Sequence, residues 1–406
     1  MFFQKKTYVS TGSLSKLAWM RFRKNRIAFS ALVFIGLVAF IAVIGYWVSP
    51  DKTPMVNEQN LLLATLKPGS TVPVLRVCKN QDIPERNIFD RLLYGQENRF
   101  SDYPFAKYKF AGDSVIITEY SKDASGLDVG FHLADVCYPL NEKTGIVKNG
   151  SMISIITRQG KSVNISVEEL RNQITKENII QKPFLLGTDR YGRDVLSQLI
   201  LGSRVSLSIG FISVAISLLI GIFLGAIAGY FGGKLDALIS WFINVVWAIP
   251  TLLLVIAITF ALGKGFWQVF VAVGLTMWVE VARVVRGQFM SLREKEFVEA
   301  ARALGYRNFR IIFRHILPNA MAPVIVISAA NFASAILLEA GLSFLGIGVQ
   351  PPMPSWGSMI KENYAYIILD YAYLAILPGI AIMIMVLAFM LIGNGLRDAM
   401  DVRSVD

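Results

Sequence analysis

The sequence is poor in the residues from which catalytic and metal sites are built. It holds two cysteines and two histidines in 406 residues, and neither His132 nor His315 belongs to a cluster with metal-ligand spacing. It also lacks a G-x-x-x-x-G-K-[ST] phosphate loop, because Gly160-Lys161-Ser162 has no leading glycine. We therefore predict no catalytic residue, no metal site and no cofactor bound by this chain.

Charge is scarce as well, at 17% of residues against 54% hydrophobic, and the mean hydropathy is +0.51. This composition is typical of a polytopic membrane protein, and 18 to 20 apolar residues suffice for one spanning helix. Apolar runs predict six transmembrane helices, at Ile27–Val48, Val205–Gly233, Ala237–Leu262, Phe266–Ala282, Ala320–Leu338 and Tyr371–Leu396. Acidic residues lie only at the ends of these runs. Active transport would therefore need energy from another protein, and a proton-driven secondary transporter is disfavoured.

Basic residues are concentrated next to the predicted spans. Residues 1–26 hold seven lysines and arginines and no acid, and a second basic cluster occupies residues 283–314. Because such clusters mark the cytoplasmic side, they predict a cytoplasmic leader at 1–26, a cytoplasmic C-terminus and an extracytoplasmic segment at 49–186. Basic and acidic residues are nearly equal in number within residues 49–186, so the net charge of +11 comes mainly from residues next to the spans. Membrane orientation and attraction to anionic lipid explain such a distribution better than nucleic-acid binding does.

Residues 49–186 change character, since they are hydrophilic and rich in proline. We expect an inserted α+β or β-rich domain, with strands at Ser114–Glu119, Met152–Thr157 and Ser162–Val167. Ser166 and Glu169 have the spacing of a capping box for a following helix.

Both cysteines, Cys78 and Cys137, fall within this segment. A disulfide is permitted outside the cytoplasm, and two free thiols in a small core are the alternative. The sequence alone does not decide between a disulfide and two free thiols.

Polar residues close to the spans are candidates for a solute pathway. Asp189, Gly192, Arg193 and Asp194 lie in a predicted amphipathic helix, 186–201, which either caps the second span or forms the outer mouth of a pathway. Within spans, Asn244, Ser328, Asn331 and Ser334 would face a wet cavity or only bond neighbouring helices. Glu339 is either a gate residue or an interfacial one.

The segment 291–319 reads as a basic hairpin of two short amphipathic helices between spans four and five. Ser291 and Glu294 resemble a capping box, Phe297, Ala301 and Leu304 share one helical face, and Gly305 ends the first helix. In the second helix we expect Asn308 as the cap, a stripe of Phe309, Ile312, Phe313 and Ile316, and an end at Pro318. Such an element suits docking to another protein.

The residues of this hairpin resemble the EAA motif of permease subunits of ATP-binding-cassette (ABC) importers. The resemblance rests on Glu299-Ala300-Ala301, on Gly305 four positions later, and on Leu317-Pro318, with Arg302 beside them. The segments LGTDRYGRDVLSQLILGSRVSL and EAGLSFLGIG are similar to the C-type dipeptide and oligopeptide permeases of the peptide and nickel branch. The similarity covers Met20–Val48 and about Pro183–Val402, and thus leaves out most of the inserted domain.

This resemblance implies a type I ABC importer permease fold, with a permease core at 187–402 in a bacterial inner membrane. It implies a homologous B-type permease, two ATPase subunits that bind ATP and Mg²⁺, and an extracytoplasmic solute-binding protein as partners. The hairpin 291–319 would couple to the ATPase through Glu299, Ala300, Ala301, Arg302, Gly305, Leu317 and Pro318. The family normally has a short link where this chain has residues 49–186, so it implies nothing about that domain.

Two alternatives remain at this point. The solute of a permease in this branch could be nickel or another small molecule. The chain could instead be a membrane-anchored receptor or scaffold that acts through residues 49–186.

Overall fold

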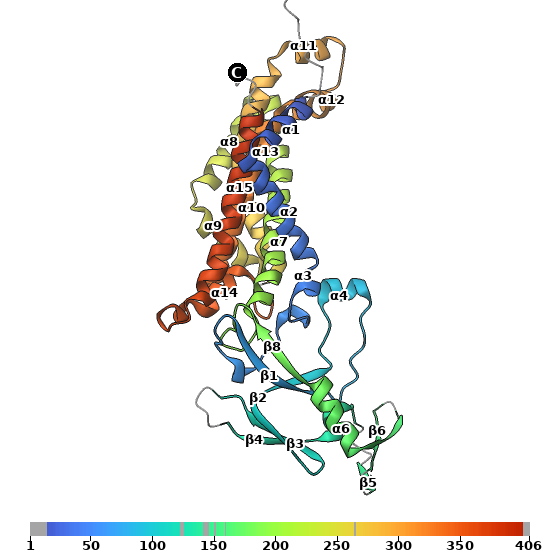
Figure 1. Cartoon of the computed structure of the whole chain (residues 1–406). Coiled ribbons are helices and arrows are strands. Elements are labelled where there is room, and N and C mark those ends of the chain that lie inside the picture. Colours follow the sequence, from blue (N-terminus) through green and yellow to red (C-terminus); the bar gives the residue numbers. More distant parts are fainter. Residues whose placement is uncertain are drawn as a thin grey trace, which may run out of the picture.

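The computed structural model describes residues 14–121, 126–140, 146–149, 152–158, 160–263 and 265–400. A long helix bundle forms one part of the molecule, and a β-rich region lies at one end of it (Figure 1). The helices α1, α11 and α12 lie at the opposite end, together with the end of α15. The first 13 residues of the predicted leader, and residues 401–402 of the predicted core, lie outside the described residues.

Within those described ranges, five helical stretches are long and apolar enough to cross a membrane. They are α2 (Arg26–Val43), α7 (Val195–Phe231), α10 (Phe266–Arg293), the stretch Asn308–Phe344, which ends in α13 (Leu317–Phe344), and α15 (Tyr373–Met400). A sixth is counted only if α8 (Gly233–Trp247) and α9 (Thr251–Leu262) together form one span, and these two meet at 92°.

The stretch Ala237–Leu262, predicted as one span, is divided in the structure between two helices that meet at a bend. The chain leaves the helical conformation before Pro250, which precedes the first turn of α9. Proline has no N–H to donate to the previous turn, and it disfavours helical geometry in the residue before it. The apolar composition of this stretch is continuous, but its helical conformation is interrupted between Trp247 and Thr251.

Glycines allow α7 and α10 to pack at close range. A Cβ atom on Gly221 would lie 2.5 Å from the Val281 Cβ, and one on Gly225 would lie 2.6 Å from the Ala282 carbonyl oxygen. Gly229 meets the Arg286 backbone in the same way, at 2.6 Å. The small residues four apart therefore form the seam between these two helices, which is how such stripes bring helices together in membranes.

The short helices connect or cap these elements. They are α1 (Leu14–Lys24), α3 (Gly45–Val48), α4 (Ile88–Tyr94), α5 (Leu133–Cys137), α6 (Val167–Gln173), α11 (Glu296–Ala303), α12 (Asn308–Arg310) and α14 (Trp356–Asn363). The predicted capping box of α6 is formed, since Ser166 Oγ accepts from the Glu169 N–H and the Glu169 carboxylate accepts from the Ser166 N–H.

The β-rich region contains two antiparallel sheets among its described residues. The strands are β1 (Ser70–Cys78), β2 (Phe100–Ala111), β3 (Ser114–Glu119), β4 (Asp128–His132), β5 (Val147–Asn149), β6 (Met152–Ile156), β7 (Ser162–Ser166) and β8 (Ile179–Phe184). One sheet has the order β4-β3-β2-β1-β8, and the other has β5-β6-β7. The strand β3 has the predicted bounds, while β6 and β7 each end one residue earlier than predicted.

The core of this region is small and apolar. It includes Leu75, Ile117, Leu133, Ile153 and Leu170, each fully buried. Alternation of buried and less buried residues along β3 and β6 places Ile117 and Ile153 on the core face of their strands, because successive side chains in a strand point to opposite sides.

Candidate functional site

The hairpin at the end opposite the sheets begins later than the sequence predicted. Ser291 lies inside α10, which continues to Arg293, and Lys295 is the N-cap residue of α11. The predicted capping box of Ser291 and Glu294 is therefore wrong. Glu294 instead accepts a hydrogen bond at 2.9 Å from the Arg293 guanidinium. The apolar pattern of α10 continues past the point where a local capping motif would have ended it.

Gly305 ends α11 through its backbone conformation. Its φ of +75° lies in the left-handed region, and no atom would lie within 4 Å of a Cβ atom placed there. The Gly305 N–H donates to the Arg302 carbonyl at 2.9 Å and the Tyr306 N–H donates to the Ala301 carbonyl at 3.1 Å. This pair of bonds is the Schellman cap that glycine favours, so the requirement at Gly305 is for conformation and not for space.

The hairpin buries one set of apolar side chains and exposes another. Val298, Ala301, Ile311 and Ile312 pack in a core with α7, α10 and α13. The predicted stripes were therefore wrong in part, because they joined residues of both sets. The exposed set consists of Phe297, Leu304, Phe309 and Phe313.

The residues of the EAA motif are mostly open to solvent. Glu299, Ala300, Arg302 and Gly305 are exposed, whereas Ala301 is 3% exposed and packs inward. Beside them, the rings of Phe309 and Phe313 contact each other in a tilted arrangement, with centroids 4.4 Å apart. A surface with several arginines, exposed acids and exposed aromatic rings has the composition of a protein-docking surface.

The second helix of the hairpin does not end at Pro318. A π-helical turn at Ile311–Ile316 joins it to α13, and Pro318 lies in the first turn of that helix. Leu317 is half-buried and Pro318 is exposed. Proline is tolerated in a first turn, where its missing N–H leaves no bond unmade.

Two side-chain contacts are made to the end of α7, one with the hairpin and one with Arg293 at the end of α10. The Tyr230 hydroxyl donates to Asn308 Oδ1 at 2.8 Å, and Arg293 Nη1 donates to the Tyr230 carbonyl at 3.3 Å. Asn308 is therefore not the cap that the sequence predicted, because Arg307 precedes α12 in that position. Displacement of the hairpin would be transmitted directly to the end of α7.

The polar residues of the spans do not share one environment. Asn331 is 1% exposed, Ser328 is half-buried and donates to the Val324 carbonyl, and Ser334 is exposed. Asn244 is exposed on α8. These four remain predicted pathway residues, without a common cavity among the described residues.

Glu339 lies fully buried between α13 and α7. One carboxylate oxygen accepts from the Ser343 hydroxyl at 2.7 Å, and the other accepts from the Ser206 hydroxyl at 3.4 Å. Such a position is internal to the bundle and not at an exposed interface. The carboxyl group links these two long helices by hydrogen bonds.

The predicted amphipathic helix at 186–201 begins only at Val195. Before it, Asp189 organises a tight turn, since its Oδ1 accepts the N–H groups of Tyr191 and Arg193, each at 2.9 Å. Arg193 donates through Nε to Asp189 Oδ2 at 2.7 Å and also pairs with Glu362. Gly192 has a φ of +75° and faces the Asn60 backbone, which a Cβ atom would approach to 1.8 Å. These charged residues form a buried turn, and Asp194 caps α7 by accepting the Ser197 N–H at 2.7 Å.

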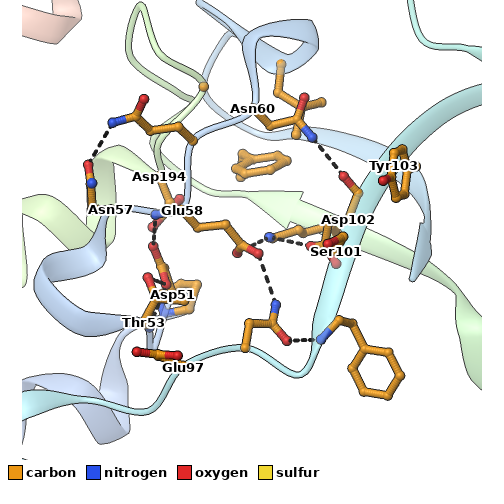
Figure 2. Close-up of a pocket in the computed structure, with 18 of the residues that line it drawn as sticks. Asp51, Thr53, Asn57, Glu58, Asn60, Glu97, Ser101, Asp102, Tyr103 and Asp194 are labelled. Atoms are coloured by element: carbon orange, nitrogen blue, oxygen red, sulfur yellow. Dashed lines mark hydrogen bonds and ion pairs between the residues drawn. The ribbon is translucent and has the colours of Figure 1, made fainter. Parts of the chain in front are cut away.

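Gly192 and Asp194 also line a cavity of about 560 Å³ where the β-rich region meets the start of α7. Figure 2 shows the side chains of Asp51, Glu58 and Asp102 directed into the same space. The charge balance of this cavity is acidic, so it attracts positively charged groups.

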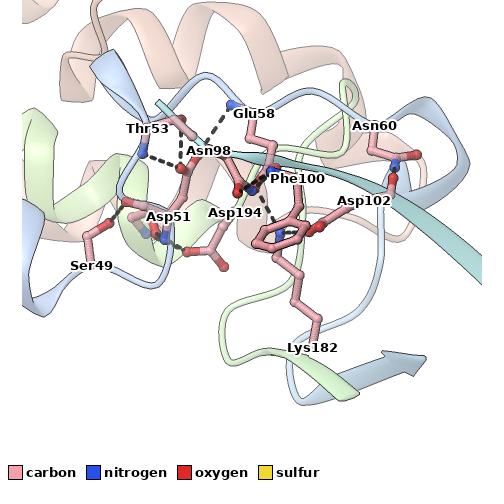
Figure 3. Close-up of polar contacts among 11 residues, drawn as sticks. Ser49, Asp51, Thr53, Glu58, Asn60, Asn98, Phe100, Asp102, Lys182 and Asp194 are labelled. Atoms are coloured by element: carbon pink, nitrogen blue, oxygen red, sulfur yellow. Dashed lines mark hydrogen bonds and ion pairs between the residues drawn. The ribbon is translucent and has the colours of Figure 1, made fainter. Parts of the chain in front are cut away.

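The ammonium group of Lys182 pairs with two of the carboxylates that line this cavity. Lys182 Nζ lies 3.0 Å from Glu58 Oε2 and 2.8 Å from Asp102 Oδ2, as Figure 3 shows. Burial opposes its charge, but the two carboxylates outweigh burial and raise the pKa of Lys182. Burial raises the pKa of the Asp51 and Asp194 carboxyls, although hydrogen bonds from Thr53 and Ser197 oppose this. Sequence motifs gave no sign of the Glu58–Lys182–Asp102 cluster, because its members are far apart in the chain.

Cys78 and Cys137 are both free thiols in the structure. Burial, aided by the charge of Glu177, raises the pKa of Cys137 to about 12. A thiol with so high a pKa is protonated at neutral pH and reacts slowly.

Two family models match parts of this chain, and one of them extends over the hairpin. A family model described as binding-protein-dependent transport system inner membrane component matches residues 221–405. A second, described as the N-terminal transmembrane domain of oligopeptide transport permease C, matches residues 13–68. Residues 69–220, which hold all the strands, lie between the two matches.

Individual relatives match over similar extents. The chain is 45% identical over 215 residues to a dipeptide transport system permease protein of Alkalihalophilus pseudofirmus, covering 53% of this chain and 70% of the relative. It is 41% identical over 216 residues to a glutathione transport system permease protein of Pectobacterium atrosepticum, covering 53% and 71%. It is 36% identical over 230 residues to an oligopeptide transport system permease protein of Bacillus subtilis, covering 57% and 75%.

Among solved structures, a chain of the MetNI methionine ABC transporter in an inward-facing conformation is 22% identical. The superposition covers 50% of this chain and 96% of that one, with a TM-score of 0.41. The sequence matches carry the assignment, since they extend over more than two thirds of each relative. The chain therefore belongs to the family of binding-protein-dependent transport system inner membrane components, the permease subunits of ABC importers.

Proposed function

We propose that this chain is the C-type permease subunit of an ATP-driven importer of dipeptides or oligopeptides. It forms half of the translocation pathway together with a homologous B-type permease. Two ATPase subunits bind ATP and Mg²⁺ on the cytoplasmic side, and a solute-binding protein delivers solute on the other. The proposed solute rests on the relatives, which are named as dipeptide, oligopeptide and glutathione permeases.

The proposed topology has six spans, with both termini and the hairpin in the cytoplasm. It counts the bent pair α8 and α9 as one span. Basic residues near α1 and the hairpin support this orientation, since lysine and arginine gather on the cytoplasmic side. Residues 49–186 are then an extracytoplasmic domain, and we assign it a docking role toward the solute-binding protein or the partner permease.

The exposed hairpin is the observation that carries this proposal. Its side chains Glu299 and Arg302 are open to solvent, while Ala301 anchors it to the bundle. ATP-driven closure of the ATPases would move the hairpin, and the hairpin would move α7 through the hydrogen bond between Asn308 and Tyr230. Such an element allows ATP binding to bias the bundle between two states.

Charge reversal at Glu299 tests the proposal. In a reconstituted importer, we expect Glu299→Arg to lose peptide-stimulated ATP hydrolysis and peptide uptake while the chain remains in the membrane. Glu168→Arg is the matched control, because Glu168 is also exposed in the first turn of a helix, α6, in the β-rich region. Wild-type uptake by the Glu299→Arg importer would refute the coupling role.

A further inference from the structure

The helix α4 presents an apolar face that no other part of the described chain covers. Ile88, Phe89 and Leu93 are 67%, 78% and 54% exposed. Together with Leu92 they occupy adjacent positions on one helical face, because residues four apart align along a helix. Asp90 and Arg91 lie on the other side of α4. A two-turn helix with this distribution is amphipathic, and its apolar side faces outward.

The guanidinium of Arg204 fixes where this face lies. It donates to the carbonyls of Ala42 and Val43, at the end of α2, and to those of Leu92 and Leu93 in α4. The two helix ends therefore lie within one side chain of each other. Figure 1 shows the same arrangement, with α4 beside α3 and away from the two sheets.

The first span, whose end lies next to α4, also has an exposed apolar side. On α2, Val33, Leu37 and Phe40 are more than half exposed and follow one side of the helix. Trp47 of α3, 55% exposed, comes next along the chain. Tryptophan is enriched where a span leaves the hydrocarbon, and α4 lies at that level.

We propose that α4 is a membrane-interface helix whose Ile88, Phe89 and Leu93 side chains lie in lipid. The bilayer leaflet next to the β-rich region is the partner that this position and this chemistry fit. An amphipathic helix in such a plane buries its apolar side at the headgroup boundary and keeps its charges in water. Arg204 holds the helix at that depth, and the domain gains an attachment to the bilayer that is separate from the spans.

Spin-label accessibility in the complete importer, reconstituted in lipid bilayers, tests this inference. Nitroxide labels are placed at Phe89→Cys, Asp90→Cys and Tyr108→Cys in a background that carries Cys78→Ala and Cys137→Ala. We expect the label at position 89 to collide severalfold more with oxygen, which concentrates in lipid, than with a water-soluble nickel chelate. The label at position 90, on the opposite side of α4, and the label on β2 at position 108 are the matched controls and should favour the nickel chelate.

Each other result contradicts the proposal. A label at position 89 that collides mainly with the nickel chelate would show a helix exposed to water. Shielding from both reagents in the complete importer, but not in the isolated chain, would show that a partner subunit covers α4. Neither result bears on peptide uptake, so the inference stands or falls separately from the proposed function.

Discussion

At the scale of single residues, Lys182 joins two carboxylates of the β-rich region by ion pairs. Its ammonium group pairs with Glu58 and Asp102, whose side chains are 22% and 8% exposed. We expect Lys182→Met to lower the stability of the folded chain by about 3–5 kcal/mol, because it leaves two largely buried carboxylates without their counter-charge. Thermal unfolding of the purified protein at pH 7.5 measures this loss.

Neutral replacements of the two carboxylates separate lost charge pairing from lost packing in the Lys182→Met variant. Adding Glu58→Gln and Asp102→Asn to Lys182→Met should recover much of the loss at pH 7.5, whereas a pure packing defect would persist in this triple variant.

Gly305 gives a second prediction at the same scale. Its φ of +75° is strained for a side chain branched at Cβ, and the space around it is open. We expect Gly305→Val to weaken the cap of α11 by about 1–2 kcal/mol and to lower peptide-stimulated ATP hydrolysis. Gly305→Asn is the control, since asparagine tolerates the left-handed region. Equal activity of both variants would show that the turn itself is not needed.

These two sites differ in how far the sequence could predict them. The need for glycine at position 305 is local, because the helix that ends there and the residue that ends it are neighbours in the chain. The ion-pair cluster forms only when β1 pairs with β2 and β8, which brings Lys182 close to Glu58 and Asp102. No local sequence motif therefore predicts it. Long-range strand pairing is the information that the sequence pattern lacked.

At the scale of elements, Arg204 links α7, α2 and α4 by hydrogen bonds to carbonyls at two helix ends. Lysine cannot reproduce this fork, since it carries its charge at one point. We expect Arg204→Lys to speed amide hydrogen exchange in α4 while leaving exchange in β1 and β2 unchanged. Uniformly faster exchange across the β-rich region would mean that Arg204 supports the whole domain and not the position of α4.

Two prolines show why the sequence predicted the positions of the spans better than it predicted their backbone geometry. Pro250 follows a break with a 92° bend between α8 and α9, whereas Pro318 sits in a stretch that stays helical from Asn308 to Phe344. The difference lies in the π-helical turn before Pro318, which places the proline in the first turn of α13. Hydropathy gave the apolar runs in both cases, but the backbone hydrogen bonding around each proline decided the geometry.

At the scale of the whole molecule, α7 connects the acidic cavity to the hairpin. It begins at the Asp194 cap and ends beside Tyr230, and its 37 residues extend for about 55 Å. The seam of Gly221, Gly225 and Gly229 holds its hairpin end closely against α10. Because a close-packed helix moves as a unit, a displacement of α7 at its hairpin end would also displace its end next to the β-rich region.

The hydrogen bond from Tyr230 to Asn308 joins the hairpin to α7. Its loss should therefore uncouple movement of the hairpin from movement of α7. We expect Tyr230→Phe, which keeps the ring beneath Arg302, to retain basal ATP hydrolysis and to lose most of its stimulation by peptide and binding protein. Asn308→Ala should do the same, and the double variant should be no worse than either, because both remove one bond. Additive losses in that double-mutant cycle would show that the two residues act separately, and the hairpin would then move α7 through Arg293 or through packing alone.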